Sequence, residues 1–149
     1  MEIERKFLVI REEWEQLQKP QPSRIMQGYL VTEENCTVRV RTKGEKAFLT
    51  VKGKTSGISR SEYEYEIPIK EAESMLTEFC PKVLSKDRYE ISYQGHLWEV
   101  DVFHGKLSPL ILAEVELSSE KEKVMLPSWA GVEVSLDPEY YNARLIGKL

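Results

Sequence analysis

Charged residues of one sign recur at every second position in several segments of this chain. The pairs are Glu2 and Glu4, Arg39 and Arg41, Glu62 and Glu64, Lys86 and Arg88, and Glu114 and Glu116. Successive side chains of a β-strand point to opposite faces, so each pair would share one face and leave apolar residues on the other. Concentrated carboxylates are costly unless a cation binds them. The pattern therefore predicts charged strand faces that bind ions.

Two arrangements of these strands are compatible with the sorted charges. A sheet could keep its charged face in water, where each cross-strand ion pair contributes only about 0.2–1 kcal/mol. Alternatively, a sheet closed into a barrel would turn the charged faces inward, with helices against the apolar outer faces, and would remove exposed strand edges. The like-signed pairs favour the barrel, because repulsion within each pair needs a bound counter-ion.

The charge balance inside such a barrel favours a metal ion together with an oligophosphate. Seven candidate cations face seven candidate anions, so the interior alone is nearly neutral, and a divalent metal and a polyanion add opposite charges. Carboxylate oxygens suit Mg²⁺ or Mn²⁺, whereas zinc prefers imidazole and thiolate ligands. The cations are Lys6, Arg39, Arg41, Lys52, Arg60, Lys86 and Arg88; the anions are Glu2, Glu4, Glu62, Glu64, Asp101, Glu114 and Glu116.

Period-two alternation predicts the strands that must position these residues, and helical spacing predicts three short helices. Short connections that contain Gly44 and Gly95 make successive strands antiparallel neighbours. The helices are expected around Trp14 and Leu17, from Ala72 to Phe79, and around Tyr141 and Leu145. The eight predicted strands are Glu2–Val9, Arg24–Val31, Thr37–Lys43, Lys46–Lys54, Arg60–Ile67, Val83–Tyr93, Leu97–Phe103 and Ile111–Leu117. The fold class is α+β.

The length and composition predict one domain over residues 1–149, with 41% hydrophobic residues and a net charge of −4. This charge disfavours a nucleic-acid partner, and no apolar run reaches the ~18 residues of a membrane helix. A charged N-terminus without a signal peptide predicts a cytoplasmic protein with Cys36 and Cys80 reduced. Neither cysteine receives a functional role, and the same holds for His96 and His104.

A series of motifs along the chain resembles the CYTH superfamily, also called the triphosphate tunnel metalloenzymes. The opening EIERK is similar to that family's ExExK signature, with Glu2, Glu4 and Lys6 in the signature positions. The remaining motifs follow in order nearly to the end of the chain. They are GYL (28–30), RVR (39–41), LTVKG (49–53), SRSEYEYEIP (59–68), KDRY (86–89), WEVDVF (98–103) and AEVEL (113–117).

The resemblance implies a closed eight-stranded antiparallel β-barrel, flanked by a few helices, whose tunnel binds a triphosphate. It assigns the metal to Glu2, Glu4, Glu114 and Glu116, and a second metal position or a water-orienting role to Glu62, Glu64 and Asp101. All seven cations would hold phosphate oxygens, with Lys6 and Lys52 also catalytic and Tyr29 orienting a catalytic lysine. Glu139 stands where the family pattern suggests a basic residue, for which Arg144 or Lys148 would compensate.

The activity expected from this resemblance is metal-dependent hydrolysis of inorganic triphosphate to pyrophosphate and phosphate. The chain shows no aromatic clamp for a base or a thiazolium ring, which favours the inorganic substrate. Alternatives stay open within the superfamily: an adenylyl cyclase, a thiamine, nucleoside or RNA triphosphatase, or a module that binds triphosphate without turnover. The partner is a small molecule rather than a nucleic acid or a membrane. The oligomeric state is open, a homodimer included.

Overall fold

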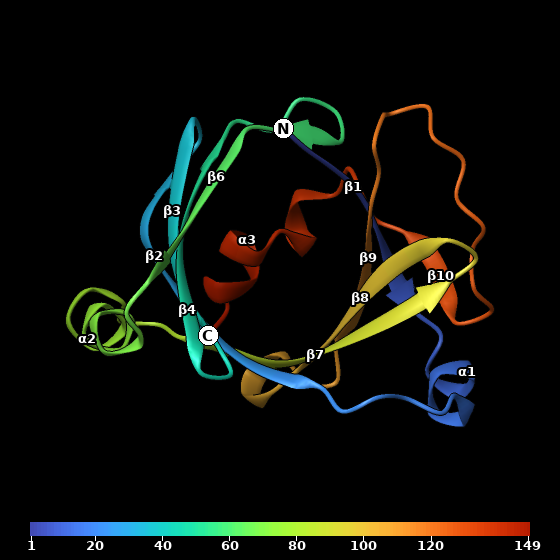
Figure 1. The fold of residues 1–149 in the computed structure, drawn as a ribbon, viewed down its shortest axis with the longest axis horizontal. Helices are drawn as coiled ribbons and strands as arrows, with labels where there is room; N and C mark the ends of the chain where they lie inside the picture. Colours follow the sequence, from blue (N-terminus) through green and yellow to red (C-terminus); the bar gives the residue numbers. More distant parts are fainter.

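A strongly curved antiparallel sheet with few helices encloses the charged side chains in the computed structural model, which describes residues 1–149 (Figure 1). Its strands are β1 (Glu2–Val9), β2 (Ser23–Glu33), β3 (Cys36–Lys43), β4 (Lys46–Gly53), β5 (Ser59–Arg60), β6 (Glu62–Ile67), β7 (Leu84–Tyr93), β8 (His96–Phe103), β9 (Ile111–Glu116) and β10 (Ala130–Glu133). The helices are α1 (Arg11–Gln16), α2 (Ile69–Phe79) and α3 (Asn142–Ile146), with 3₁₀ turns η1 (Gly105–Leu107) and η2 (Pro138–Tyr140). None of the helices is long and apolar enough to cross a membrane.

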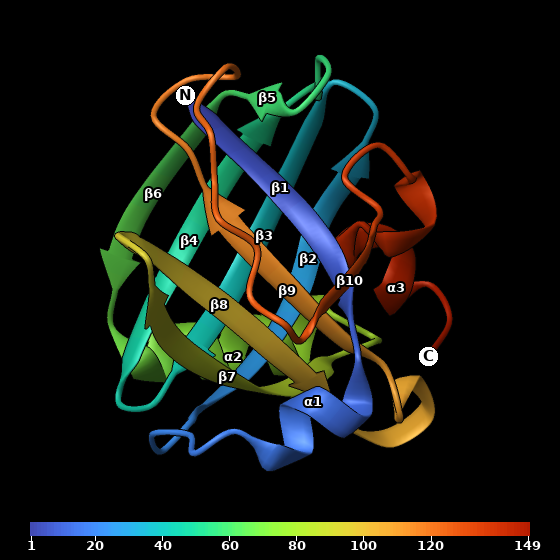
Figure 2. The ribbon, with the colours of Figure 1, turned by 90° about the vertical axis from the view of Figure 1, so that its right-hand side faces the viewer.

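The hydrogen-bonded order of the strands is β10-β1-β9-β8-β7-β2-β3-β4-β6, and β5 pairs with β1. Only two residue pairs join β5 to β1, Glu2 with Arg60 and Ile3 with Ser59, beside the N-terminus (Figure 2). Strand β6 ends the path and has no ladder with β1 or β10. The closed eight-stranded barrel is therefore not confirmed, whereas the antiparallel sheet is.

The parity of the predicted strands is confirmed; three larger differences follow, and several other strand ends are shifted by one residue. The segment predicted as one strand from Arg60 to Ile67 is split at Ser61 into β5 and β6, which pair with different neighbours. Strand β10 has no counterpart in the prediction, because its four residues carry no alternation long enough to identify. Strand β2 extends two residues past the predicted Val31, to Glu33.

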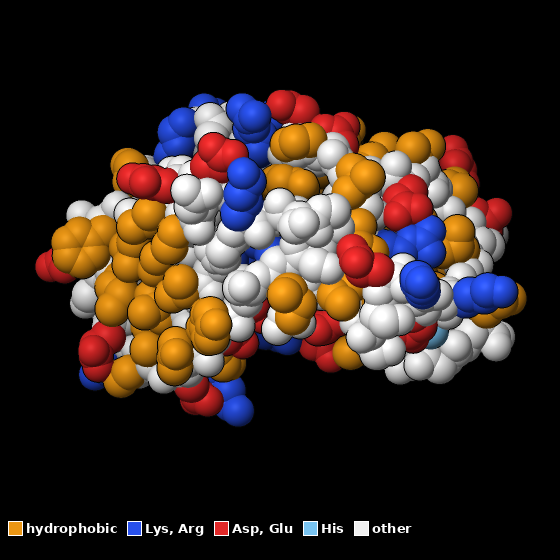
Figure 3. Space-filling view, turned by 90° about the horizontal axis from the view of Figure 1, so that it is seen from above, with side chains coloured by type: hydrophobic (Ala, Val, Ile, Leu, Met, Phe, Trp, Pro, Cys, Tyr) orange, Lys and Arg blue, Asp and Glu red, His pale blue; other side chains and the backbone are white.

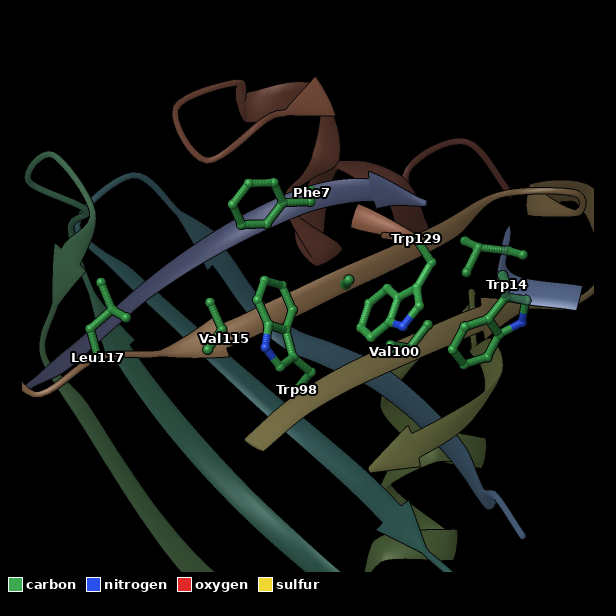
Figure 4. Packing of buried hydrophobic residues seen from close by; sticks show 9 residues of the cluster. Phe7, Trp14, Trp98, Val100, Val115, Leu117 and Trp129 are labelled. Carbon is green, nitrogen blue, oxygen red and sulfur yellow. The ribbon is translucent and has the colours of Figure 1, made fainter. Parts of the chain in front are cut away.

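Aromatic residues pack on the outer face of β1, β8 and β9 (Figure 4). Trp98 and Trp129 meet edge to face with ring centroids 5.5 Å apart, and Trp129 and Trp14 do so at 5.7 Å. Phe7 lies 5.5 Å from Trp98. Edge-to-face pairs are favourable beyond the area that they bury. This cluster fixes the parity of β1, so that Glu2, Glu4 and Lys6 face inward on alternate positions.

Helix α2 covers the outer face of β2, β3 and β4, where Ala72 and Leu76 pack with Val40 and Ala47. Beyond α2 the outer face is uncovered, and Figure 3 shows hydrophobic side chains gathered on this side of the molecule. Val31, Tyr63 and Tyr65 are among the exposed apolar residues of its strands.

Helix α3 does not pack outside the sheet, which corrects the expectation that the helices flank the barrel. It lies between the two halves of the curved sheet in Figure 1. Leu145 and Ile146 pack with Leu84, Phe103 and Leu112. These three residues have the inward parity of Lys86, Asp101 and Glu114, so one end of the inner face is apolar. The C-terminal segment therefore fills that end from within.

Gly28 allows the end of α2 to approach β2 closely. A Cβ at this position would lie 2.7 Å from Cβ and Sγ of Cys80, closer than atoms in proteins come without a shift. We expect Gly28→Ala to lower the free energy of unfolding by about 1–3 kcal/mol, the usual cost of overpacking. The matched control is Gly53→Ala, whose new Cβ would meet Ser61 at an ordinary 3.4 Å. Urea unfolding of both variants checks this, and equal stabilities would contradict it.

Candidate active site

Two cavities, of about 870 Å³ and 280 Å³, lie within the curve of the sheet. Both are lined by Glu2, Glu4, Arg39, Lys52 and Asn142, so the two spaces meet at these residues. The larger cavity adds Lys6, Tyr29, Arg60 and Arg144, and the smaller adds Arg41, Glu62, Glu64, Arg88, Glu99, Glu114 and Glu116. The structure therefore brings most of the predicted site residues to one connected space.

Glu4 and Glu114 form a close carboxyl pair on the acidic side of this space. Burial, followed by the negative charges of Glu114 and Glu2, raises the pKa of Glu4 to about 9. Burial also opposes ionisation of Glu114, but the positive charges of Lys6 and Arg88 outweigh it and hold the pKa of Glu114 well below its ordinary value. A hydrogen bond joins the two carboxyls. Protonated Glu4 thus donates to ionised Glu114.

Glu2, Lys52 and Glu62 form a second cluster where β1, β4 and β6 face one another. The Lys52 Nζ lies 3.1 Å from Oε1 of Glu2 and 3.2 Å from Oε2 of Glu62. Burial raises the pKa of Glu2, with Lys52 opposing it. At the more exposed Glu62, the attraction of Lys52 outweighs burial and lowers the pKa. One lysine therefore holds two carboxylates together.

Lys6 connects the acidic side to the C-terminal segment. Its ammonium lies 3.5 Å from Oε1 of Glu114 and donates a 2.9 Å hydrogen bond to the backbone carbonyl of Tyr140. Burial opposes the charge, but Glu114 and Glu4 raise the pKa of Lys6 above its ordinary value. The ring of Tyr141 lies 5.8 Å from the same nitrogen. Lys6 is therefore charged and held at the wall of the larger cavity.

Arg39 and Arg60 lie on strands that border the cavities. Arg39 donates to the Thr50 hydroxyl at 3.2 Å and lies 3.7 Å from Glu64. Thr50 in turn donates to Glu64 at 3.0 Å. Arg60 donates twice to the carbonyl of Gly53, at 3.1 and 2.8 Å, so it stands among neutral acceptors.

Lys86, Arg88 and Asp101 form an ion cluster beneath the smaller cavity. Arg88 donates to both Asp101 oxygens, at 2.8 and 2.9 Å, and Lys86 lies 2.7 Å from Oδ2. Although burial opposes ionisation, these two cations hold the pKa of Asp101 far below its ordinary range. Lys86 is 0% exposed and Asp101 2%, and neither lines a cavity. The predicted contacts of Lys86 and Asp101 with phosphate, metal or water stay a prediction, because in this structure both residues are occupied by ion pairs within the cluster.

Several residues of the site carry no role in the sequence prediction. Thr50 and Glu99 lie on the charged face by parity alone, so the alternation could have identified them. Glu99 lines the smaller cavity and accepts from Arg88 at 3.2 Å. Asn142 reaches both cavities from α3, a placement that depends on tertiary packing and leaves no local sequence signal.

The basic residues near the C-terminus pair with the acidic residue that departs from the family pattern. Glu139 lies 3.7 Å from Arg144 and 3.5 Å from Lys148. Arg144 lines the larger cavity, and Lys148 lines neither. The structure thus places Arg144, rather than Lys148, where compensation for Glu139 would act.

The carboxylates form pairs rather than a preformed metal cage, since no group of three or more His, Cys, Asp or Glu converges on one point. This fits Mg²⁺ or Mn²⁺, because such ions keep several waters and bind through one or two carboxylates together with substrate phosphates. Burial and the repulsion of Glu114 and Glu2 raise the pKa of Glu4, and a cation among these carboxylates would relieve that repulsion. Glu2, Glu4, Glu114 and Glu116 all have oxygen ligands of the required kind.

A curved antiparallel sheet with carboxylates and cations on its inner face agrees with the resemblance in the motifs. This chain belongs to the CYTH family, whose domain matches residues 1–143. It is 44% identical over 146 residues to an inorganic triphosphatase of Acetivibrio thermocellus, a match that covers 97% of this chain and 92% of the relative. An inorganic triphosphatase of Nitrosomonas europaea is 38% identical over 148 residues, covering 97% and 95%.

Solved structures agree with this assignment. The crystal structure of an inorganic triphosphatase matches with a TM-score of 0.69 and 34% identity, over 100% of this chain and 96% of the other. A protein of Pyrococcus furiosus matches with a TM-score of 0.63 at 18% identity over 81% of each chain, which shows the shared fold alone. The family predicted from the motifs is confirmed.

The proton on Glu4 predicts how the stability of the metal-free protein depends on pH. The pKa of Glu4 is about 9 in the folded protein and near 4.5 in the unfolded chain, so stability falls as the pH rises between these values. Glutamine resembles the protonated carboxyl and does not titrate. We therefore expect Glu4→Gln to be more stable than the wild type at pH 8, with a melting temperature at least about 2 °C higher.

Urea and thermal unfolding in EDTA at pH 5, 7 and 9 measure this effect, and the difference between the two proteins should widen with pH. Glu78→Gln, which makes the same change at an exposed position of α2, is the matched control. Parallel dependence of stability on pH in the wild type and Glu4→Gln would contradict a protonated Glu4 that donates to Glu114.

Proposed function

We propose that this protein hydrolyses inorganic triphosphate to pyrophosphate and phosphate with the help of Mg²⁺ or Mn²⁺, and that residues 1–149 act as one domain. The observation that carries the proposal is a connected space lined by both carboxylates and basic side chains, in a chain 44% identical to an inorganic triphosphatase. A triphosphate needs cations around its oxygens, and its metal ion needs carboxylates. Both kinds of ligand face the same space.

The acidic side of the space would hold the metal. We propose Glu2, Glu4, Glu114 and Glu116 as its ligands, with Glu4 giving up its proton when the ion binds. The metal would screen phosphate charge and polarise the phosphoryl group that is transferred. Glu62 shares Lys52 with Glu2, which makes it a candidate for a second metal position.

The basic side of the space would hold the phosphate chain. Arg39, Arg41 and Lys52 line the smaller cavity, and Lys6 and Arg60 line the larger one. We propose that these side chains bind the phosphate oxygens and stabilise the charge that develops on the transferred group, which is the main contribution a protein makes to phosphoryl transfer. Tyr29 lines the larger cavity with Lys6 and Lys52 and would help to orient one of them.

Two acidic residues have distinct proposed tasks in this arrangement. Glu64 lines the smaller cavity and has 43% of its side chain exposed, so it could accept a hydrogen bond from an attacking water. Asp101 is enclosed by Lys86 and Arg88 and would keep both cations in place below the substrate. Phosphate contact of these two cations would then pass through the exposed edge of Arg88, which lines the smaller cavity.

A substrate panel tests the proposal. Tripolyphosphate, pyrophosphate, ATP and thiamine triphosphate are each incubated with Mg²⁺ and with Mn²⁺, and phosphate, pyrophosphate and cyclic AMP are measured. Tripolyphosphate should be converted fastest and give pyrophosphate and phosphate in equal amounts. Cyclic AMP from ATP would instead identify a cyclase, and faster turnover of thiamine triphosphate or ATP would change the substrate. Binding without any product would identify a binding module.

Removal of the metal should stop the reaction without unfolding the protein. The aromatic cluster contains none of the proposed metal ligands, and the β-ladders are held by backbone hydrogen bonds, so circular dichroism and the melting transition should persist in excess EDTA. Phosphate release from tripolyphosphate should fall to background and return when Mg²⁺ is restored. Unchanged release in EDTA would refute metal dependence.

Lys52 is the cation that we expect to contribute most to the chemical step. It lies between Glu2 and Glu62 and borders both cavities. Lys52→Ala should lower kcat at least about 100-fold, the lower range for loss of one preorganised donor. Lys52→Arg should also be impaired, because a planar guanidinium does not replace a compact ammonium.

Lys46→Ala removes the same charge from the exposed start of β4 and is the control, expected to keep kcat within about twofold of the wild type. Circular dichroism shows whether each variant is folded. If folded Lys52→Ala keeps its kcat and raises only KM, Lys52 binds substrate without stabilising the transition state.

A further inference from the structure

Arg41 differs from the other buried cations of the site in having no carboxylate partner. Five of the seven predicted phosphate-binding cations pair with a carboxylate; these are Lys6, Arg39, Lys52, Lys86 and Arg88. Arg60 and Arg41 pair only with neutral acceptors, and of the two only Arg41 is fully buried, with 7% exposed. The acceptor at Arg41 is the side chain of Gln27.

The contact between Gln27 and Arg41 is short and doubled. Gln27 Oε1 accepts from Nε of Arg41 at 2.9 Å and from Nη2 at 2.6 Å. A guanidinium has only donors, so the oxygen of the amide must be the atom that faces it. The two residues are directly opposite each other on β2 and β3. Gln27 is 0% exposed, which leaves its side chain no freedom to turn away.

No other neighbour across the sheet can take over this task. The residue opposite Arg41 on β4 is Phe48, which has no acceptor. Gln27 itself faces Leu84 on β7. The neutral amide is therefore the one cross-strand group that fixes the plane of the guanidinium.

The surroundings of Arg41 are electropositive. Burial, followed by the nearby charges of Arg39 and Arg88, lowers the pKa of Arg41 to about 9, with Asp101 opposing them. A carboxylate in place of Gln27 would relieve this repulsion and stabilise the empty protein. The amide satisfies the buried N–H groups without neutralising the charge, and Arg41 lines the smaller cavity with that charge unshared.

We propose that Gln27 is a positioning residue that holds the Arg41 guanidinium toward the phosphate chain and, being neutral, keeps its full positive charge for the substrate. This inference rests on the proposed triphosphatase function. A structural role alone would require only a hydrogen-bond acceptor of the right length. Glutamate and glutamine meet that requirement equally, so a structural role predicts unchanged substrate binding by Gln27→Glu, whereas the proposed role predicts weaker binding.

The test compares Gln27→Glu with Gln27→Met, which are similar in size and differ in what they offer Arg41. Gln27→Glu still accepts the hydrogen bonds and should melt at or above the temperature of Gln27→Met. Its KM for tripolyphosphate in saturating Mg²⁺, and its Kd for tripolyphosphate by calorimetry in EDTA, should both rise at least about tenfold, because an ion pair now competes with the substrate. Gln27→Met should raise both values by less.

Gln21→Glu, an exposed change between α1 and β2, is the control for the added charge and should leave KM and Kd unchanged. The inference is overturned if Gln27→Glu binds tripolyphosphate as the wild type does, or if Gln27→Met loses more affinity than Gln27→Glu. Should Gln27→Glu not fold, Gln27→Met decides alone: it must raise Kd while keeping its circular dichroism, and wild-type affinity would overturn the inference.

Failure of the inference is distinct from failure of the proposed function. If the wild type does not hydrolyse tripolyphosphate, the proposed function is wrong, whatever the variants do. If the wild type hydrolyses it and the two Gln27 variants behave alike, only the role of Gln27 is wrong.

Discussion

The structure depends on one electrostatic constraint: many charges of both signs face the inside of a curved sheet and must compensate one another. Moving a charge out of water is costly unless a partner and hydrogen bonds replace the solvent. The strands meet this constraint locally, through pairs such as Lys6 with Glu114 and Lys52 with Glu2. The apolar faces are then free to build the hydrophobic core outside, where Trp14, Trp98 and Trp129 meet. Charged side chains therefore line the inside of the sheet and much of the hydrophobic core lies outside it, the reverse of the arrangement in most small domains.

The charges are closely paired at one depth of the site and less well compensated at another. Below the smaller cavity, Asp101 pairs with both Lys86 and Arg88, and Arg88 also pairs with Glu99. Nearer the cavity, burial and the neighbouring charges of Glu114 and Glu2 raise the pKa of Glu4, and Arg41 has no carboxylate partner. A bound metal ion would compensate the carboxyl groups around Glu4, and a bound phosphate chain would compensate the charge of Arg41. We propose that the less well compensated charges mark where the ligands bind and that the closely paired charges hold the site in shape.

The sequence predicts the charged face because strand parity is a local property. Alternation over six to eight residues places Glu2, Lys6 and Arg41 inward without knowledge of the fold, and the structure agrees. Strand parity does not predict features that depend on contacts between residues far apart in the sequence. Closure of the barrel is one, since the break at Ser61 sends β5 and β6 to different partners.

The position of α3 is another such feature, because its apolar stripe fits the inside of the sheet as well as the outside. Helix α3 packs inside because Leu84, Phe103 and Leu112 make one end of the inner face apolar. Strand parity also places Gln27 on the inner face, but a neutral residue among charged ones carries no sequence signal, and its role depends on the contact with Arg41.

The most direct test of the central claim is a crystal structure with Mn²⁺ and imidotriphosphate, a triphosphate whose bridging nitrogens resist hydrolysis. We expect an anomalous manganese peak among Glu2, Glu4, Glu114 and Glu116. We also expect the phosphate chain against Arg39, Arg41 and Lys52, with the Gln27 contact to Arg41 intact. Manganese and phosphate bound elsewhere on the protein, or a phosphate chain away from these cations, would contradict the central claim.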